Sequence, residues 1–260
     1  MSAPVELYAI DVVKEYGLRS SRHQALKGVS LSITEGQRIG VVGESGSGKS
    51  TISRILVGLE TATSGVVEYQ GRDVRGLLGS RPDRVSFRTD VQYIGQDTSS
   101  SFDPRRKLIE SVTAPLGYLR GIHGDEARDI ALETIKRMEL NPGLADRYPG
   151  QVSGGQRQRF ALARGLVVKP KILLCDEVVS ALDVSVQGAI LNLLKKYCLD
   201  TGAGMLFVSH GLPATAFVTE EIVVMNQGEI VERGSSRDVL TAPKDEYTAT
   251  LVAAYRGAAA

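Results

Sequence analysis

Two adjacent carboxylates, Asp176 and Glu177, directly follow the apolar run at residues 172–175, and a third, Asp183, comes seven residues after the first. A buried charge without a partner is costly, so carboxylates at the end of a core strand call for an explanation. Such a pair could hold a metal ion and polarise a water molecule for attack. The alternative is structural, because acidic residues after a strand often cap the next helix.

A glycine-rich segment supplies a second chemical group. GESGSGKS, residues 43–50, fits the phosphate-loop pattern G-x-x-x-x-G-K-[ST], between a strand-like run and helical spacing. Its backbone N–H groups could turn toward phosphate oxygens, Lys49 adds a full positive charge, and the Ser50 hydroxyl could ligate Mg²⁺. The alternative is a flexible Gly/Ser turn, although the pattern arises by chance in roughly one chain of this length in a hundred.

The two groups form one site if the strands that carry them are neighbours. We expect the strand at residues 172–175 to lie directly beside the strand that leads into the loop, with its carboxyl end open toward the phosphates. Asp176 would then reach Mg²⁺ directly or through water. Glu177 would face the γ-phosphate and polarise the attacking water. The sequence therefore predicts a site that binds and hydrolyses a nucleotide.

Strand and helix patterns alternate around these residues. Helical spacing after the loop places Ile52, Ile55, Leu56 and Leu59 on one side, and a helical segment is expected over about 107–148. Within that segment the apolar face is Ala127, Ile130, Ala131, Thr134, Ile135 and Met138. Strand patterns cover VELYAIDVV, LKGVSLSI, RIGVVG, SGVVEYQG, KILLCDE and GMLFVSH, and a hairpin is expected to turn at Gln227-Gly228. This order predicts an α/β sheet with a helical subdomain.

Bulk composition limits the functional classes. The 260 residues suffice for one large domain, and 31 basic against 30 acidic residues give a net charge of +1, without the basic excess of a nucleic-acid footprint. Cys175 and Cys198 form no CxxC pattern, which favours a reducing compartment. The sequence shows no secretory signal pattern and no apolar run of about 20 residues, so work at a membrane would require another protein.

VSGGQRQR, residues 152–159, resembles the signature motif of ABC-type ATPases, and other motifs of that family occur in the expected order. Tyr16 matches an aromatic residue that stacks on adenine, Gln96 matches the Q-loop glutamine, SALD at 180–183 matches the D-loop, and His210 matches the switch histidine. Singly, Tyr16, Gln96 and His210 have ordinary explanations in packing, solvation or local structure. Their order and spacing favour the family.

The resemblance implies a P-loop NTPase fold of the ABC ATPase type. Its α/β core has a mixed sheet, an N-terminal antiparallel β-subdomain and an inserted helical subdomain. Residues 1–260 would form a single ABC ATPase domain. The nucleotide-binding core with the β-subdomain would occupy 1–106 and 150–242, the helical subdomain about 107–149, and a C-terminal helix and tail 243–260.

The resemblance further implies a head-to-tail dimer with a second, homologous or identical ATPase. Each ATP would lie between one subunit's phosphate loop and the SGGQ of the other. Catalytic roles fall to Glu177, His210 and Gln96, and Mg²⁺ contacts to Ser50, Gln96 and Asp176. Asp183 would link the two sites, with a surface helix cap as its alternative. The ATP contacts would be Tyr16, Gly43, Glu44, Ser45, Gly46, Ser47, Gly48, Lys49, Ser50, Thr51, Ser153, Gly154, Gly155, Gln156 and Asp183.

A narrower resemblance concerns transport. SSSFDPRRKLIESVTAPL, SALDVSVQ and APKDEYTATLVAA are similar to segments in the ATPases of dipeptide, oligopeptide and nickel importers. This implies a subunit that energises uptake of peptides or a related small solute, such as nickel or a metal chelate. Its partners would be two transmembrane permeases and an extracytoplasmic substrate-binding protein, with no nucleic acid. Its place would be peripheral, on the cytoplasmic face of the cell (inner) membrane.

Three positions depart from the family pattern. Val178 stands where proline usually follows the glutamate, Val152 where the signature usually opens with leucine, and Gly211 where aspartate usually follows the histidine. None removes a charged catalytic group, but glycine is conformationally permissive and would loosen the loop that aims His210. Two alternatives stay open: a soluble ABC ATPase acting on nucleic acid or ribosomes, and a cassette that binds ATP without turnover, against which Glu177 argues. Without a C-terminal cysteine cluster, no iron–sulfur centre is expected.

Overall fold

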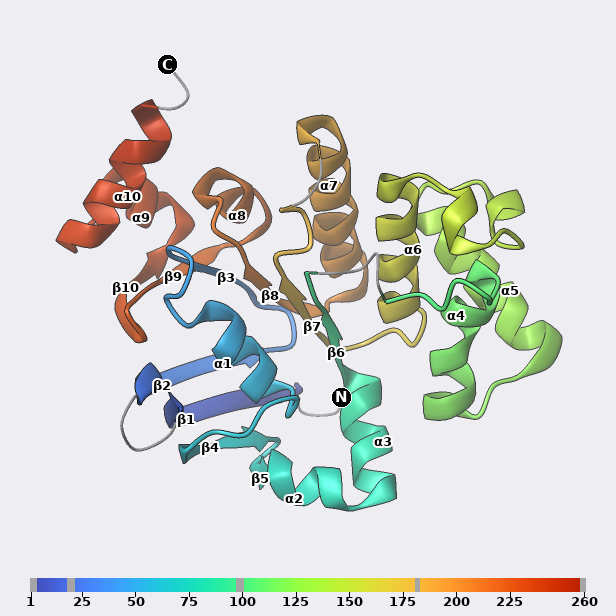
Figure 1. Ribbon diagram of the computed structural model, residues 1–260, viewed down its shortest axis with the longest axis horizontal. Coiled ribbons are helices and arrows are strands. Elements are labelled where there is room, and N and C mark those ends of the chain that lie inside the picture. The colour runs from blue at the N-terminus through green and yellow to red at the C-terminus, as the bar shows by residue number, and fades with distance from the viewer. Residues whose placement is uncertain (1–3, 18–21, 97–100, 181–182, 258–260) are drawn as a thin grey trace.

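The computed structural model describes residues 4–17, 22–96, 101–180 and 183–257, which fold into two sheets and the helices around them (Figure 1). The smaller sheet is antiparallel, in the order β2-β1-β4-β5, and the larger has the order β10-β9-β3-β8-β7-β6. The smaller sheet consists of β1 (Glu6–Tyr16), β2 (His23–Thr34), β4 (Ser64–Tyr69) and β5 (Arg72–Asp73). The larger consists of β3 (Arg38–Val42), β6 (Val91–Ile94), β7 (Ile172–Asp176), β8 (Gly204–Val208), β9 (Glu221–Asn226) and β10 (Glu229–Ser235).

The larger sheet is parallel except for the antiparallel edge strand β10. The carboxyl ends of β3, β6, β7 and β8 therefore meet at one edge, where the phosphate loop and the acidic pair both lie. However, β8 separates β3 from β7, so the expectation that these two strands are direct neighbours is wrong. All three are continuous apolar strands buried on both faces, and such strands carry no sequence signal of their order.

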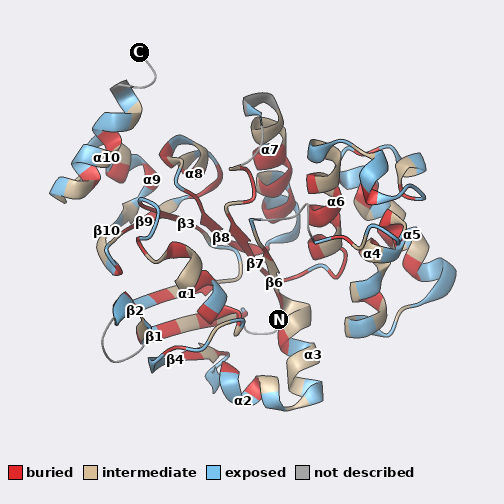
Figure 2. Ribbon diagram, in the orientation of Figure 1, coloured by how far each residue is buried: buried red, intermediate tan, exposed pale blue. Residues whose placement is uncertain are grey.

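The side chains of β7 divide between the two faces of the sheet. Ile172 and Leu174 pack in a cluster with the helix α1 (Lys49–Leu56) and the small sheet. Leu173 and Cys175 pack in a second cluster with α6 (Gly154–Leu166) and α7 (Val184–Thr201). The red, buried strands in Figure 2 thus lie between α1 with the small sheet on one face and α6 with α7 on the other. The phosphate-loop helix α1 and the signature helix α6 cover opposite faces.

The helix α1 is shorter than its sequence pattern suggests. Ile52, Ile55 and Leu56 are buried as expected, but Leu59 is 58% exposed and lies beyond the end of the helix. Gly58 adopts a left-handed φ of +65°, a conformation typical of residues that terminate helices. The expectation for Leu59 is therefore wrong.

The segment after β6 is helical but interrupted. It contains α4 (Leu108–Pro115), the π-helix η1 (Leu116–Arg120), α5 (Gly124–Arg137), and two short 3₁₀ turns, η2 (Pro142–Leu144) and η3 (Pro149–Gln151). Gly121, with φ of +67°, breaks the expected continuous segment between η1 and α5. Of the predicted apolar face, Ala127, Ala131, Ile135 and Met138 are buried, whereas Ile130 and Thr134 are only half-buried.

Two further helices, α2 (Val74–Gly79) and α3 (Arg81–Asp90), follow the small sheet. The predicted hairpin is confirmed: Gln227 and Gly228 join β9 to β10 and both have positive φ, as a two-residue turn of this kind requires. The chain continues after β8 and β10 into α8 (Leu212–Val218), α9 (Ser236–Thr241) and α10 (Glu246–Gly257). Across the described ranges, none of the helices is long and apolar enough to cross a membrane.

Candidate active site

The phosphate loop connects β3 to α1, and its shape depends on glycine. Gly43, Gly46 and Gly48 have φ of +152°, +82° and +101°. A Cβ atom on Gly43 would lie 2.1 Å from the carbonyl oxygen of Met225, and one on Gly48 would lie 2.6 Å from that of Ala25. Because other residues would clash there and rarely adopt these dihedrals, the loop needs glycine at both positions.

Lys49 is the buried cation of the loop, with only 3% of its surface exposed. Its Nζ donates to the backbone carbonyls of Gly43, at 2.9 Å, and of Glu44, at 2.7 Å. Burial lowers the pKa of Lys49, while the carboxylates of Glu177 and Asp176 act in the opposite direction. The ammonium is thus desolvated and bonded mainly to neutral groups, which suits it to a phosphate ligand.

Asp176, the last residue of β7, connects the acidic strand to the loop. Its carboxylate is 1% exposed; Oδ1 accepts a hydrogen bond from Ser50 Oγ at 2.9 Å, and Oδ2 accepts one from the Tyr93 hydroxyl at 2.8 Å. The structure therefore brings Ser50 and Asp176 together although β8 separates their strands. The helix-cap alternative fails for Asp176, because the next helix, α7, begins only at Val184.

Tyr93 was not identified from the sequence, because no motif marks it. Burial and the nearby Asp176 raise the pKa of Tyr93 to about 12, so its hydroxyl remains a donor at neutral pH. It thereby fixes the Asp176 oxygen that Ser50 does not contact.

Glu177 follows Asp176 in an unusual backbone conformation. Its φ is +51°, its N–H donates to Val208 O at 2.9 Å, and its carbonyl accepts from Ser180 Oγ at 2.9 Å. A non-glycine residue with positive φ is uncommon and persists where its surroundings hold it in place. The main chain is therefore fixed on both sides of the Glu177 Cα atom. The half-buried carboxylate of Glu177 remains close enough to Lys49 to act on the pKa of the lysine.

Val178, one of the departures from the family pattern, is firmly held. Its side chain is 2% exposed in the core, and its carbonyl accepts a hydrogen bond from Gln158 Nε2 at 2.6 Å. Gln158 belongs to the signature helix α6. The loop that carries Glu177 is therefore connected to α6 within the same chain.

Gln96 and His210 reach the same edge of the sheet from other strands. Gln96 follows β6, His210 follows β8, and both residues are exposed. Their parallel strands bring them to the edge that carries the loop and the acidic pair. Their catalytic roles stay predictions.

Tyr16 lies at the end of β1 with 39% of its surface exposed. Lys14 Nζ is 4.8 Å from the centroid of its ring, and its hydroxyl donates to Glu60. Burial, followed by the bond to Glu60, raises the pKa of Tyr16, and the hydroxyl of Thr51, in the first turn of α1, acts to lower it. The ring is thus near the end of the loop, while adenine stacking stays a prediction.

The signature residues form a helix start. Ser153 caps α6: its Oγ accepts from Gln156 N at 3.2 Å, and Gln156 Oε1 accepts from Ser153 N at 3.0 Å. Ser153 and Gly154 are exposed, whereas Gly155 and Gln156 are half-buried. This helix start combines backbone N–H groups with a serine hydroxyl, and such groups suit an anion.

The D-loop is described only in part. Ala181 and Leu182 lie outside the described residues. Asp183 is exposed and stands at the N-cap position of α7, but its side chain makes no capping hydrogen bond. The structure therefore gives no support to the capping alternative for its side chain. The predicted role of Asp183 between two ATP sites stays a prediction.

The donor set fits magnesium. Ser50 Oγ and the Asp176 carboxylate offer two oxygens beside the loop. In the part of the chain that the structure describes, no group of three or more His, Cys, Asp or Glu side chains could hold a metal by itself. Mg²⁺ is usually held by one or two protein oxygens together with substrate phosphates, which is what these two residues could support.

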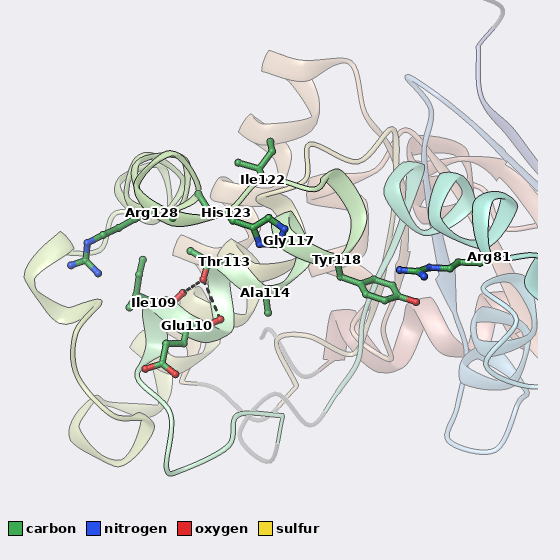
Figure 3. Close-up of a pocket in the computed structure, with 12 residues that line it drawn as sticks. Arg81, Ile109, Glu110, Thr113, Ala114, Gly117, Tyr118, Ile122, His123 and Arg128 are labelled. Atoms are coloured by element: carbon green, nitrogen blue, oxygen red, sulfur yellow. Dashed lines mark hydrogen bonds between the residues drawn. The ribbon is translucent and has the colours of Figure 1, made fainter.

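A hollow of about 760 Å³ lies elsewhere, on the helical segment (Figure 3). Glu110 and Arg128 lie toward one end of it, and Tyr118 and Arg81 toward the other. None of the predicted site residues lines it, so the chemistry described above does not involve this hollow.

The chain is similar to known proteins along most of its length. A family model described as ABC transporter matches residues 26–180. The oligopeptide transport ATP-binding protein OppF of Lactococcus lactis is 40% identical over 230 residues, which cover 88% of this chain and 72% of the relative. The dipeptide transport ATP-binding protein DppF of Escherichia coli is 37% identical over 255 residues, 95% of this chain and 75% of the relative.

Solved structures extend this likeness to the fold. A bacterial ABC transporter cassette solved as a dimer has a TM-score of 0.80 and 33% identity, over 89% of this chain and 99% of that one. A post-hydrolysis dimer of a cassette bound to ADP and Pi has a TM-score of 0.79, with the same identity and coverage. The expected fold class is confirmed: an α/β ABC ATPase core with a mixed sheet, an antiparallel N-terminal sheet and helices.

Lys49→Ala should weaken Mg-ATP binding by about 10- to 100-fold, because it removes a charge-assisted contact to phosphate. Titration calorimetry on the purified chain would measure the Kd. Lys196→Ala, at an exposed lysine on α7, is the matched control and should bind normally. Equal affinity for wild type and Lys49→Ala would contradict the assignment of the loop.

Proposed function

This chain belongs to the ABC transporter family, and from that premise we propose that it hydrolyses ATP to energise the uptake of oligopeptides or dipeptides through partner permeases. The observation that carries the proposal is the hydrogen bond between Ser50 and Asp176, which unites the phosphate loop with the acidic strand. The relatives are named for oligopeptide and dipeptide transport, so peptides are favoured over nickel or a metal chelate as the solute.

The described geometry supports a division of labour around ATP. The loop N–H groups and Lys49 would bind the β- and γ-phosphates, and Ser50, Asp176 and Gln96 would hold Mg²⁺. Magnesium, when bound, neutralises charge on the phosphates. Glu177 would orient and polarise the attacking water, His210 would contact the γ-phosphate side of the site, and Tyr16 would stack on adenine.

A second ATPase would complete each site. The loop helix α1 and the signature helix α6 cover opposite faces of the sheet, so one chain offers them in different directions. The exposed Ser153 and Gly154 would then contact the γ-phosphate held by the partner's loop. Closure of such a head-to-tail dimer, whether of identical or homologous subunits, would exclude water from ATP. The dimeric cassettes among the solved relatives favour this arrangement.

Permeases and an extracytoplasmic binding protein would complete the importer, with this chain peripheral on the cytoplasmic face of the inner membrane. A hollow of about 570 Å³ offers a contact for an acidic permease segment, since Arg84, Arg88, Arg106 and Arg164 line it. Arg88 and Arg164 are half-buried, and this burial lowers the pKa of both guanidinium groups. Asp103, which also lines the hollow, already pairs with Arg105.

Glu177→Gln should retain ATP binding but slow hydrolysis by about 10²- to 10⁴-fold, as expected for loss of a general base. Phosphate release by the purified protein would give the rate, and calorimetry the affinity. Glu229→Gln, at an exposed glutamate on β10, is the control and should hydrolyse ATP normally. A Glu177→Gln variant with wild-type turnover would remove this residue from the chemistry.

Ser153→Ala should impair hydrolysis much more than ATP binding to the isolated subunit, because the serine acts on a partner's nucleotide. The capping bond to Gln156 is also lost, at about 1 kcal/mol of stability. Ser235→Ala, which removes the cap of α9, is a control for that stability loss alone. Nucleotide affinity that falls as far as turnover would count against a shared site.

Purification of the chain from its native membrane should recover permease proteins, identified by mass spectrometry. Arg84→Glu with Arg106→Glu should abolish the co-purification and leave basal ATPase activity intact, since charge reversal repels an acidic segment. Arg237→Glu, on α9, is the matched control. ATPase activity stimulated by nucleic acid and not by membrane partners would instead favour a soluble ABC ATPase.

A further inference from the structure

The C-terminal helix α10 contacts two loops of the proposed ATP site. The hydroxyl oxygen of Tyr247 accepts a hydrogen bond from the backbone N–H of Glu44, in the phosphate loop, at 2.9 Å. Two turns later, the Tyr255 hydroxyl donates to the backbone carbonyl of His210. Both bonds connect α10 to the main chain of a site loop.

The Tyr255 hydroxyl contacts the loop of His210 directly before Gly211, a residue without a side chain. Gly211 follows His210 with an extended backbone, φ −87° and ψ 100°. Burial raises the pKa of Tyr255, whereas the backbone N–H of Leu212 lowers it. The hydroxyl thus holds the carbonyl that immediately precedes Gly211.

The rest of Gly211 is anchored inside its own loop. Its N–H donates to Ser209 Oγ at 2.9 Å, and its carbonyl accepts from Thr215 Oγ1 at 2.9 Å. The bond to Ser209 holds the N–H of the His210–Gly211 peptide, and Tyr255 holds the carbonyl of that same planar peptide. The orientation of the His210–Gly211 peptide thus depends on its own loop at one edge and on α10 at the other.

Helix α10 is itself firmly placed. The Glu232 carboxylate on β10 accepts from the N–H groups of Lys244, at 3.0 Å, and Asp245, at 3.0 Å, just before the helix. Val252 is 4% exposed and packs in a cluster with Leu212 and with Val42, the residue before the phosphate loop. The helix can therefore transmit a fixed position to both loops.

We propose that Tyr255 is a positioning residue for His210, and that with Tyr247 it makes α10 a brace between the switch-histidine loop and the phosphate loop. The inference rests on the proposed ATPase function. A tyrosine that served only to fill the core would need its ring but not its hydroxyl, and removing the hydroxyl separates the two roles.

Tyr255→Phe should lower kcat for ATP by about 3- to 10-fold, the net value of one hydrogen bond in the reacting geometry. The KM for ATP should change less than about twofold, because the phosphate loop keeps its own contacts. The measurement is steady-state ATP hydrolysis by the full-length chain, with the midpoint of thermal unfolding recorded alongside. Equal kcat in wild type and Tyr255→Phe overturns the proposal.

A matched control removes a different bond of the same helix. Arg256 donates to Leu240 O, in α9, at 2.7 Å, so Arg256→Met removes a bond of α10 that is not made to a site loop and should leave kcat unchanged. If Arg256→Met lowers kcat as much as Tyr255→Phe does, the loss is one of general stability and the proposal is wrong.

A second substitution tests the mechanism itself. A Cβ on Gly211 would lie 3.5 Å from Ser209 Oγ and 3.7 Å from Ala214 Cβ, both ordinary contacts, and φ there suits alanine. Gly211→Ala should therefore restore at least half of the lost kcat in the Tyr255→Phe background, because alanine restricts the backbone that the hydroxyl had restrained. A loss that Gly211→Ala does not reduce overturns the proposal. A wild-type chain without ATPase activity would instead refute the proposed function.

Discussion

Two opposite charges, Lys49 and Asp176, are almost fully buried at one edge of the sheet, and the site depends on how they are satisfied. The ammonium bonds to loop carbonyls and the carboxylate bonds to two hydroxyls. Neutral partners offset the cost of desolvation without cancelling either charge. The cation thus remains available to phosphate and the carboxylate to a metal, in a setting where both interactions are strong. In a direct ion pair, each charge would already be neutralised by the other, and neither would be available to a ligand.

The parallel sheet is what assembles these groups. Because β3, β6, β7 and β8 run in the same direction, the residues that follow them arrive at one edge, although they lie far apart in sequence. The insertion of β8 between β3 and β7 does not disrupt the site, since Ser50 reaches Asp176 from the start of α1. The alternation of side chains along β7 has a second consequence. The side chains on one face of β7 pack with the phosphate-loop helix α1, and those on the other face pack with the signature helix α6. The phosphate loop and the signature residues therefore face in different directions.

Motifs that require particular residue types could be predicted from the sequence, and contacts made by ordinary residues could not. The glycines of the loop follow from dihedral angles and close approach, so the pattern at residues 43–50 carries its own explanation. The order of buried strands leaves no such trace, because each is an apolar run. Leu59 fits the helical spacing in the sequence, but the left-handed Gly58 ends the helix before it, so spacing alone gave the wrong prediction. Tyr93 acts through a hydroxyl whose partner is set only by the fold.

Val178 and Gly211, the two residues of the site loops that depart from the family pattern, lie in main chain that is held in the same way. In each case a residue from a distant element bonds to the main chain of the altered loop: Gln158 to the carbonyl of Val178, and Tyr255 to that of His210. A backbone that loses a local restraint can be held equally well by a bond from outside, provided that the donor belongs to a rigid helix. The signature helix α6 and the C-terminal helix α10 serve this purpose here. The loops that carry Glu177 and His210 are therefore each connected to a helix, so that any displacement of α6 or α10 would also displace a predicted site residue.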